Sequence, residues 1–219
     1  MRSILHPFVF ALVAISAAPG AVAASVLYLN EGTFLSLAGP VTLESFEGLP
    51  AGTAVASLDA GPFTLSSASQ SVRVRDANAS GMVATHGSHY INWLASASTG
   101  TLVFLFDAPA TVFGVTLTDL WDSGSNPQLD VTTNGGDSFA PALQGSAPLA
   151  SGVVRFVGLT TATPFTALTL RTHLSTVDNV GVDEVYFNVA PIPEPAAAPL
   201  LLLGLSVLGL ATRRRKGAS

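Results

Sequence analysis

Residues 26–187 alternate between short apolar runs and breaks rich in Gly, Pro, Asn, Asp and Ser. The runs are rich in β-branched and aromatic residues, and none sustains the 3.6-residue apolar period of an amphipathic helix. Leu102, Phe104 and Phe106 occupy every second position, which places them on one face of a strand. This pattern predicts β-strands packed as a sandwich or jelly roll and argues against alternating βαβ units.

Eleven segments are predicted as strands. They are residues 26–29, 41–46, 63–67, 71–75, 90–94, 101–106, 111–120, 129–133, 153–158, 165–170 and 180–187. The chain between its two ends is long enough for a two-sheet core, and it shows no internal repeat. We therefore expect a single all-β domain, a β-sandwich or jelly roll, over residues 24–190.

The N-terminus has the three-part order of a secretory signal peptide. Arg2 precedes an apolar run over residues 8–18, a Pro19-Gly20 break follows, and the small triplet Ala21-Val22-Ala23 comes next. The apolar run is too short to span a bilayer, which favours cleavage after Ala23 over a retained anchor. We expect residues 1–23 to be removed on export; a buried N-terminal helix is the alternative.

The C-terminus carries a second targeting pattern. A proline-rich stretch over residues 190–195 leads into residues 196–212, which hold no charge, and then into Arg213, Arg214, Arg215 and Lys216. At about 1.5 Å rise per residue, the uncharged segment is long enough for a short transmembrane helix. The basic cluster orients this helix with the extreme C-terminus in the cytoplasm, so residues 24–190 are expected to lie outside it.

The tripeptide Pro193-Glu194-Pro195, the apolar segment and the terminal basic cluster resemble the PEP-CTERM protein-sorting signal of Gram-negative bacteria in their order and spacing. The resemblance covers residues 191–219. It implies that an exosortase, a membrane-embedded transpeptidase-like enzyme, recognises the tripeptide and cleaves near it while the chain sits in the inner membrane. It also implies a surface or extracellular-matrix protein of a bacterium that makes exopolysaccharide and biofilm. A permanent single-pass anchor is the alternative.

Composition and charge exclude several classes of site and partner. The chain has no cysteine, which excludes disulfides, thiolate metal sites and cysteine nucleophiles. The net charge of −5 hides an uneven distribution, because residues 24–190 hold thirteen of the fourteen acids and four of the nine bases. The central domain therefore carries about −9, which argues against nucleic acid as a partner.

Three phrases of the central domain resemble the β-jelly-roll ectodomains of PEP-CTERM proteins and of bacterial carbohydrate-binding modules. They are residues 44–52, 113–117 and 178–185. In that fold the first and last strands lie side by side, which would bring Glu44 or Glu47 close to Asp183 or Glu184. The resemblance bears on the fold more than on the function.

Those four carboxylates, Glu44, Glu47, Asp183 and Glu184, predict a structural Ca²⁺ site if the terminal strands pair. Calcium takes about six to eight oxygen ligands and would relieve the repulsion among the acids. The chain has no EF-hand loop or other fixed calcium spacing, so carboxylates solvated at strand ends are the alternative. Ca²⁺ is the one cofactor that the sequence suggests.

Two loops are candidates for sugar binding. Trp121, Asp122 and Asn126 combine a flat apolar ring with hydrogen-bonding side chains, the pairing that carbohydrate sites use. The segment over residues 76–93 offers a similar set. Its members are Asn78, His86, His89, Tyr90 and Trp93. The competing interpretation, which we favour, is that Trp93 and Trp121 are core or rim aromatics.

Catalysis has little support in the sequence. His86 and His89 lack a third ligand at a telling distance, so a zinc site is not expected. The chain holds no nucleophile elbow, P-loop or dinucleotide fingerprint. We expect an exported, non-enzymatic β-sandwich surface protein; the alternatives are a lectin like a carbohydrate-binding module and a glycoside-active enzyme with two carboxylates.

Overall fold

The computed structural model describes residues 24–52, 54–67, 72–95, 100–120, 128–141, 143, 153–173 and 176–188. The predicted signal peptide, the sorting signal and the candidate sugar-binding residues Trp121, Asp122 and Asn126 lie outside these residues. Among the described residues no helix is both long enough and apolar enough to cross a membrane, and the predicted span over residues 196–212 falls outside them.

The described residues form eleven strands and one short helix, so the prediction of an all-β fold is confirmed. The elements in chain order are β1 (Val26–Tyr28), α1 (Glu31–Leu37), β2 (Thr42–Glu44), β3 (Ser57–Asp59), β4 (Phe63–Ser66), β5 (Val72–Arg75), β6 (Tyr90–Ala95), β7 (Thr101–Thr118), β8 (Leu129–Thr133), β9 (Ser138–Phe139), β10 (Val154–Thr172) and β11 (Asp178–Phe187).

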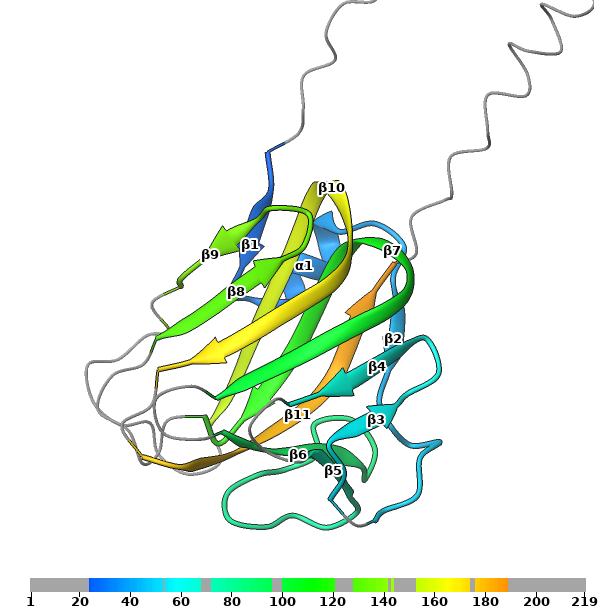
Figure 1. Ribbon diagram of the computed structural model, residues 1–219, viewed down its shortest axis with the longest axis vertical. Coiled ribbons are helices and arrows are strands. Elements are labelled where there is room, and N and C mark those ends of the chain that lie inside the picture. Colours follow the sequence, from blue (N-terminus) through cyan, green and yellow to red (C-terminus); the bar gives the residue numbers. More distant parts are fainter. Residues whose placement is uncertain are drawn as a thin grey trace, which may run out of the picture.

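All eleven strands belong to one hydrogen-bonded sheet, which is folded over into the two layers of a sandwich (Figure 1). The long antiparallel strands β7 and β10 run through both layers. One layer joins the first half of β7 to β4 and the second half of β10 to β8. The other joins the second half of β7 to β11 and the first half of β10 to β1.

Both long strands bend where proline interrupts the ladder. The register between β10 and β7 shifts on either side of Phe165, beside Pro164, and Pro109 lies opposite in β7. Proline cannot donate to a ladder and is tolerated at such irregular positions. Because of the bend, Phe104 and Phe113 of the same strand meet across the core with ring centroids 4.9 Å apart.

The bends correct one part of the sequence prediction. Residues 101–106 and 111–120 were expected to be two strands, but they belong to the single strand β7, which ends at Thr118. Residues 153–158 and 165–170 likewise belong to β10. We interpreted the prolines as breaks between strands. In the structure β7 and β10 pair with each other on both sides of the bend, so each strand continues past its proline.

The core lies between the two layers and follows the predicted alternation. Val72 and Val74 are buried in it, whereas Arg73 and Arg75 of the same strand project to the other face. Rings from both layers pack at its centre in edge-on or tilted pairs. These rings belong to Phe63, Phe104, Phe106, Phe113, Phe165 and Phe187. Burial of these aromatic side chains contributes to the stability of the sandwich.

Helix α1, which periodicity did not predict, covers the outer face of the β7–β10 layer. Asn30 caps it by accepting the backbone N–H of Thr33 at 2.9 Å, and a seven-residue helix is too short to show a repeating apolar stripe. Its buried Phe34 lies on Gly114 and Gly158, which are direct partners in the ladder. A Cβ on Gly158 would stand 2.6 Å from the Phe34 ring, so the helix docks only where both strands lack side chains.

Both boundaries of the domain lie at one end of the sandwich, which we call the terminal end (Figure 1). Val26 pairs with Thr160, Thr160 pairs with Val112, and the Asn188 N–H bonds the Val112 carbonyl oxygen. One row across the sheet thus joins the first strand to the last described residue. The opposite end, the far end, lies about 20 Å away along the six residue steps from Val112 to Thr118.

Candidate functional site

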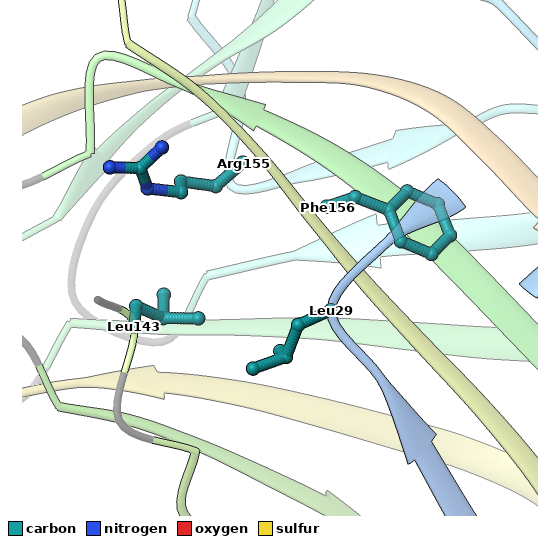
Figure 2. A pocket seen from close by; sticks show the side chains of 4 residues that line it. All are labelled: Leu29, Leu143, Arg155 and Phe156. Carbon is teal, nitrogen blue, oxygen red and sulfur yellow. The ribbon is translucent and has the colours of Figure 1, made fainter. Parts of the chain in front are cut away.

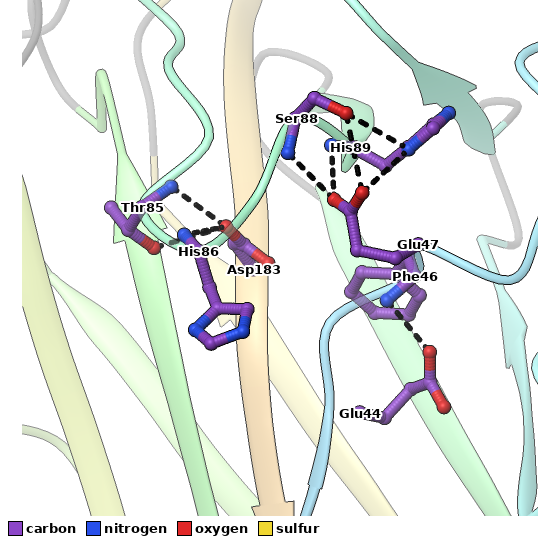
Figure 3. A network of polar contacts seen from close by, with 8 residues as sticks. All are labelled: Glu44, Phe46, Glu47, Thr85, His86, Ser88, His89 and Asp183. Carbon is purple, nitrogen blue, oxygen red and sulfur yellow. Dashed lines mark hydrogen bonds and ion pairs between the residues drawn. The ribbon is translucent and has the colours of Figure 1, made fainter.

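The most elaborate polar structure of the domain is the loop Thr85–His89, which we call the clamp loop (Figure 3). Two carboxylates from distant parts of the chain hold it against the outer face of the sheet. They are Asp183 of β11 and Glu47, which follows β2. The donors on the loop are mostly backbone N–H groups, so the loop conformation rather than its residue types creates the binding surface for each acid.

Asp183 is fully buried, and its charge is compensated by four hydrogen bonds. One carboxylate oxygen accepts the Thr85 N–H at 2.7 Å, the His86 N–H at 2.9 Å and the Thr85 hydroxyl at 3.0 Å. The other accepts the N–H of Glu184 at 2.8 Å. Glu184 has φ of 48°, at the point where the β11–β7 register shifts. The bulge therefore turns the Glu184 N–H toward the Asp183 carboxylate.

Glu47 holds the other half of the clamp loop. Its Oε1 accepts the backbone N–H of Ser88 at 2.7 Å and that of His89 at 2.6 Å. The backbone N–H groups of His89 and Ser88, with the two side chains, lower the pKa of Glu47 to about 2. Gly87 sits between them with φ of 67°, and a Cβ there would stand 2.4 Å from Glu47 Oε1. Glycine is thus required both by the backbone and by the carboxylate.

The four predicted calcium ligands lie close in the fold, because Glu44 of β2 is paired with Val185 of β11. Each carboxylate, however, is engaged by protein donors. Glu44 accepts the N–H of Phe46 at 2.6 Å, and Glu184 accepts the Thr116 hydroxyl at 3.1 Å. Within the described residues no three His, Asp or Glu side chains are grouped so that they could hold a metal ion. The acids serve here as anchors for backbone N–H groups.

Ser88, His89 and Glu47 superficially resemble a hydrolytic triad, but the geometry does not match one. His89 Nδ1 lies 3.3 Å from the Ser88 hydroxyl and 3.2 Å from Glu47 Oε2. A triad needs one ring nitrogen for the nucleophile and the other for the acid. Here both neighbours share Nδ1, and the Ser88 hydroxyl also contacts Glu47 Oε2 at 3.2 Å. In this arrangement the cluster fixes the loop by hydrogen bonds and lacks the two-sided contact of a triad histidine.

The sugar-binding candidates fall into separate places. Trp93 is fully buried in the core, so its ring has no face for a sugar; it is the core aromatic of the competing interpretation. Tyr90 is also buried, and its hydroxyl donates to the Ala77 carbonyl. Asn78 and His86 are exposed. Trp121, Asp122 and Asn126 lie outside the described residues.

Two further polar contacts were not predicted. At the far end His173 Nε2 meets Asp130 Oδ2 at 2.6 Å. At the terminal end Asp137 accepts the hydroxyls of Ser25, Thr161 and Thr133, which ties the first described residues to the hairpin after β8. Burial raises the pKa of Asp137, but these hydrogen bonds outweigh burial and lower it. Hydroxyl donors are too common in this sequence to have indicated the contact.

The chain carries a PEP-CTERM protein-sorting motif at residues 191–216, which confirms the prediction drawn from the tripeptide, the apolar segment and the basic cluster. The motif indicates a secreted protein that is sorted to the cell surface. It lies outside the described residues and starts three positions after Asn188, the last of them. No curated protein matches the chain.

The sandwich is similar to solved adhesin and carbohydrate-binding domains. The K1 cleaved adhesin domain of Lys-gingipain from Porphyromonas gingivalis W83 is 11% identical, with a TM-score of 0.43, over 70% of this chain and 100% of that one. The C-terminal family 22 carbohydrate-binding module of Clostridium thermocellum Xyn10B is 14% identical, with a TM-score of 0.38, over 68% and 92%. TmCBM61, solved with β-1,4-galactotriose, is 16% identical, with a TM-score of 0.31, over 67% and 94%. Similarity this distant carries no information on the ligand.

Proposed function

We propose that this chain, which carries the PEP-CTERM motif, is a non-catalytic surface protein whose β-sandwich acts in the extracellular matrix after exosortase processing. The observation that carries the proposal is the motif itself at residues 191–216, directly behind the last strand. The signal peptide over residues 1–23 starts export. The apolar segment over residues 196–212 then holds the chain in the inner membrane until its tail is cut.

Each part of the tail has a separate task. Pro193, Glu194 and Pro195 form a stiff, extended segment that enters the exosortase cleft, because proline restricts the backbone to extended conformations. Residues 196–212 keep this segment next to the membrane-embedded enzyme. The basic residues Arg213–Lys216 stay in the cytoplasm and fix the orientation.

The arrangement of the domain supports this delivery. Val26 and Asn188 share one row at the terminal end, so both targeting segments are joined to the same end of the sandwich. The far end is then the part of the domain furthest from the membrane. The pairing of β2 with β11 supports the jelly-roll form of the sandwich.

Association with exopolysaccharide, and hence a place in biofilm, is the function we propose for the delivered domain. Lectin-like sugar binding through Trp121, Asp122 and Asn126 is the second candidate. It is favoured because the strands on either side of this segment, β7 ending at Thr118 and β8 beginning at Leu129, have those ends at the far end. Binding of a glycan array that is lost in Trp121→Ala, but kept in a variant of an exposed far-end residue such as Val177→Ala, supports it.

The proposal is tested on the tail. Glu194→Ala should leave export intact and trap the chain in the inner membrane with its C-terminus uncut, as read by cell fractionation and by mass spectrometry of the C-terminal peptide. Pro191→Ala, a change outside the tripeptide, is the control and should be processed normally. Normal tail cleavage in the Glu194→Ala variant would overturn the proposal.

A further inference from the structure

A groove lies beside β1 and β10, and it has no role in the sorting function proposed above. Strand β1 pairs with only three residues of β10, from Gly158 to Thr160. The chain then turns away at Asn30 into α1, so the edge of β10 from Val154 to Val157 has no further strand on this side among the described residues. The groove lies along this uncovered edge.

Two adjoining cavities form the groove. The first measures about 280 Å³ and is lined by Leu29, Leu143, Arg155 and Phe156 (Figure 2). The second measures about 290 Å³. Its lining residues are Leu27, Tyr28, Leu29, Asn30 and Thr33. Leu29 borders both cavities and is 46% exposed, so the two cavities adjoin at its side chain, and we call them together the groove.

Arg155 supplies the only charge among these lining residues. Figure 2 shows its guanidinium across the first cavity from Leu143, while the Phe156 ring turns away. Its Nε is buried without a hydrogen-bond partner, and one Nη donates to the carbonyl of Val154 at 3.3 Å. No carboxylate among the described residues lies within ion-pair distance of it, although the domain carries about −9. A buried donor without a hydrogen-bond partner lowers the stability of the fold. A carboxylate could supply that partner, because its two oxygens can accept parallel hydrogen bonds from a guanidinium group.

The second cavity has the amphipathic character of a sugar site. Tyr28 and Leu29 offer apolar surface, and the Tyr28 hydroxyl lies 3.4 Å from that of Thr160. Asn30, which also lines this cavity, uses its Oδ1 to cap α1, and its amide Nδ2 remains a potential donor to a ligand. Apolar walls with a few polar groups are the usual composition of a site for a small organic ligand.

We propose that this groove binds a carboxylate-bearing sugar chain, with a uronate carboxylate on Arg155 and the neighbouring sugar against Tyr28 and Leu29. The inference deepens the proposed function, on which it rests, by naming the class of polysaccharide and the site. Charged repulsion from the acidic domain is screened beyond about 8 Å at physiological ionic strength, so the local guanidinium decides recognition.

The test uses the purified full chain in detergent and isothermal titration with oligogalacturonate. The same oligomer with its carboxylates methyl-esterified is the matched neutral ligand. We expect binding of the acid form and at least tenfold weaker binding of the ester. Arg155→Gln should weaken binding of the acid about ten- to a hundredfold, because hydrogen bonds to charged groups are lost. Arg171→Gln, an exposed arginine of the same strand outside the groove, should bind as the parent chain does.

Three results would overturn the inference: equal binding of acid and ester, equal loss in the two arginine variants, or absence of binding by a folded parent chain. Arg155→Lys is a second variant, to be used if Arg155→Gln does not fold. It keeps the positive charge but loses the two parallel N–H donors, so it should bind with intermediate affinity. Self-association abolished by Leu29→Asp, without uronate binding, would assign the groove to a second copy. Normal tail cleavage without uronate binding would overturn this inference alone and leave the sorting proposal standing.

Discussion

Asp183 and Thr85 lie 98 positions apart in the chain, yet the buried Asp183 carboxylate accepts both the N–H and the hydroxyl of Thr85. The hydrogen-bond donors stabilise the buried charge, and the carboxylate in turn fixes the positions of the donors. The clamp loop and strand β11 therefore form one structural unit, and disturbing either should loosen both.

Asp183→Asn is expected to lower the free energy of unfolding by roughly 3 kcal/mol, because the amide presents donors where the loop already presents N–H groups. Asp76→Asn, a change of an exposed acid directly after β5, should alter the free energy of unfolding by less than about 0.5 kcal/mol. Urea titration of the full chain in detergent measures both. Equal stability of the two variants would show that Asp183 does not anchor the loop.

Glu47 should make stability depend on pH in acid. Its pKa is lowered from 4.5 to about 2 in the folded chain by the backbone N–H groups of His89 and Ser88. A lowered pKa means that the carboxylate contributes stability above pH 4.5 and that this contribution is lost as the pH falls from about 4.5 to about 2. Glu47→Gln removes the titrating group, so its melting temperature should fall less steeply than that of the parent over this range.

The control for this pH dependence is Asp59→Asn, which changes an exposed carboxylate that accepts the Gly61 N–H. It should follow the parent curve. Parallel melting curves for the parent and Glu47→Gln between pH 5 and pH 2 would contradict the expected role of Glu47.

Gly87→Ala should destabilise the domain more than glycine replacement at an otherwise similar backbone position. Gly39 has φ of 74°, close to the 67° of Gly87, but a Cβ at Gly39 meets nothing within 4 Å. Gly39→Ala therefore measures the cost of the left-handed backbone alone, about 1–2 kcal/mol. Gly87→Ala adds displacement of Glu47 and should cost roughly 1 kcal/mol more. Thermal unfolding of both variants decides; a smaller effect at Gly87 would mean that the carboxylate moves freely.

Calcium is expected to have no effect on the folded domain. Glu44, Glu47, Asp183 and Glu184 already accept hydrogen bonds from the protein, and a cation would have to displace those donors. The melting temperature of the EDTA-treated chain should thus be the same before and after Ca²⁺ is added. A rise in melting temperature with Ca²⁺, absent in Asp183→Asn, would restore the calcium site that the sequence suggested.

The sequence predicted the strands well wherever buried and less buried residues alternate, as in Val72–Arg75 and Leu129–Thr133. The prediction failed at Pro109 and Pro164. A proline usually ends a strand, but a strand can continue past it at a bulge when a neighbouring strand pairs on both sides. Pairing between β7 and β10, which are distant in the sequence, cannot be predicted from the local residues. The same limit applies to α1, whose seven residues gain their helical conformation from Phe34 packing on two paired glycines.

The candidate site was half predicted. The sequence led us to expect that the first and last strands pair; in the structure the first strand β1 pairs with β10, and it is β2, with Glu44, that pairs with β11. The partners of Glu47 and Asp183 were missed because the donors of the clamp loop are backbone N–H groups, which every residue except proline possesses. Gly87 was the one local signal, since a glycine in a polar loop marks a backbone position that other residues rarely adopt.

The position of both domain boundaries at the terminal end has a mechanical consequence. If the chain is held at its tail and pulled by a ligand at the far end, the tension runs parallel to β7 and β11. Force in that direction shears the antiparallel ladder, so its hydrogen bonds resist together instead of opening one at a time. Under such a load the sandwich is expected to yield only when many of these hydrogen bonds break together.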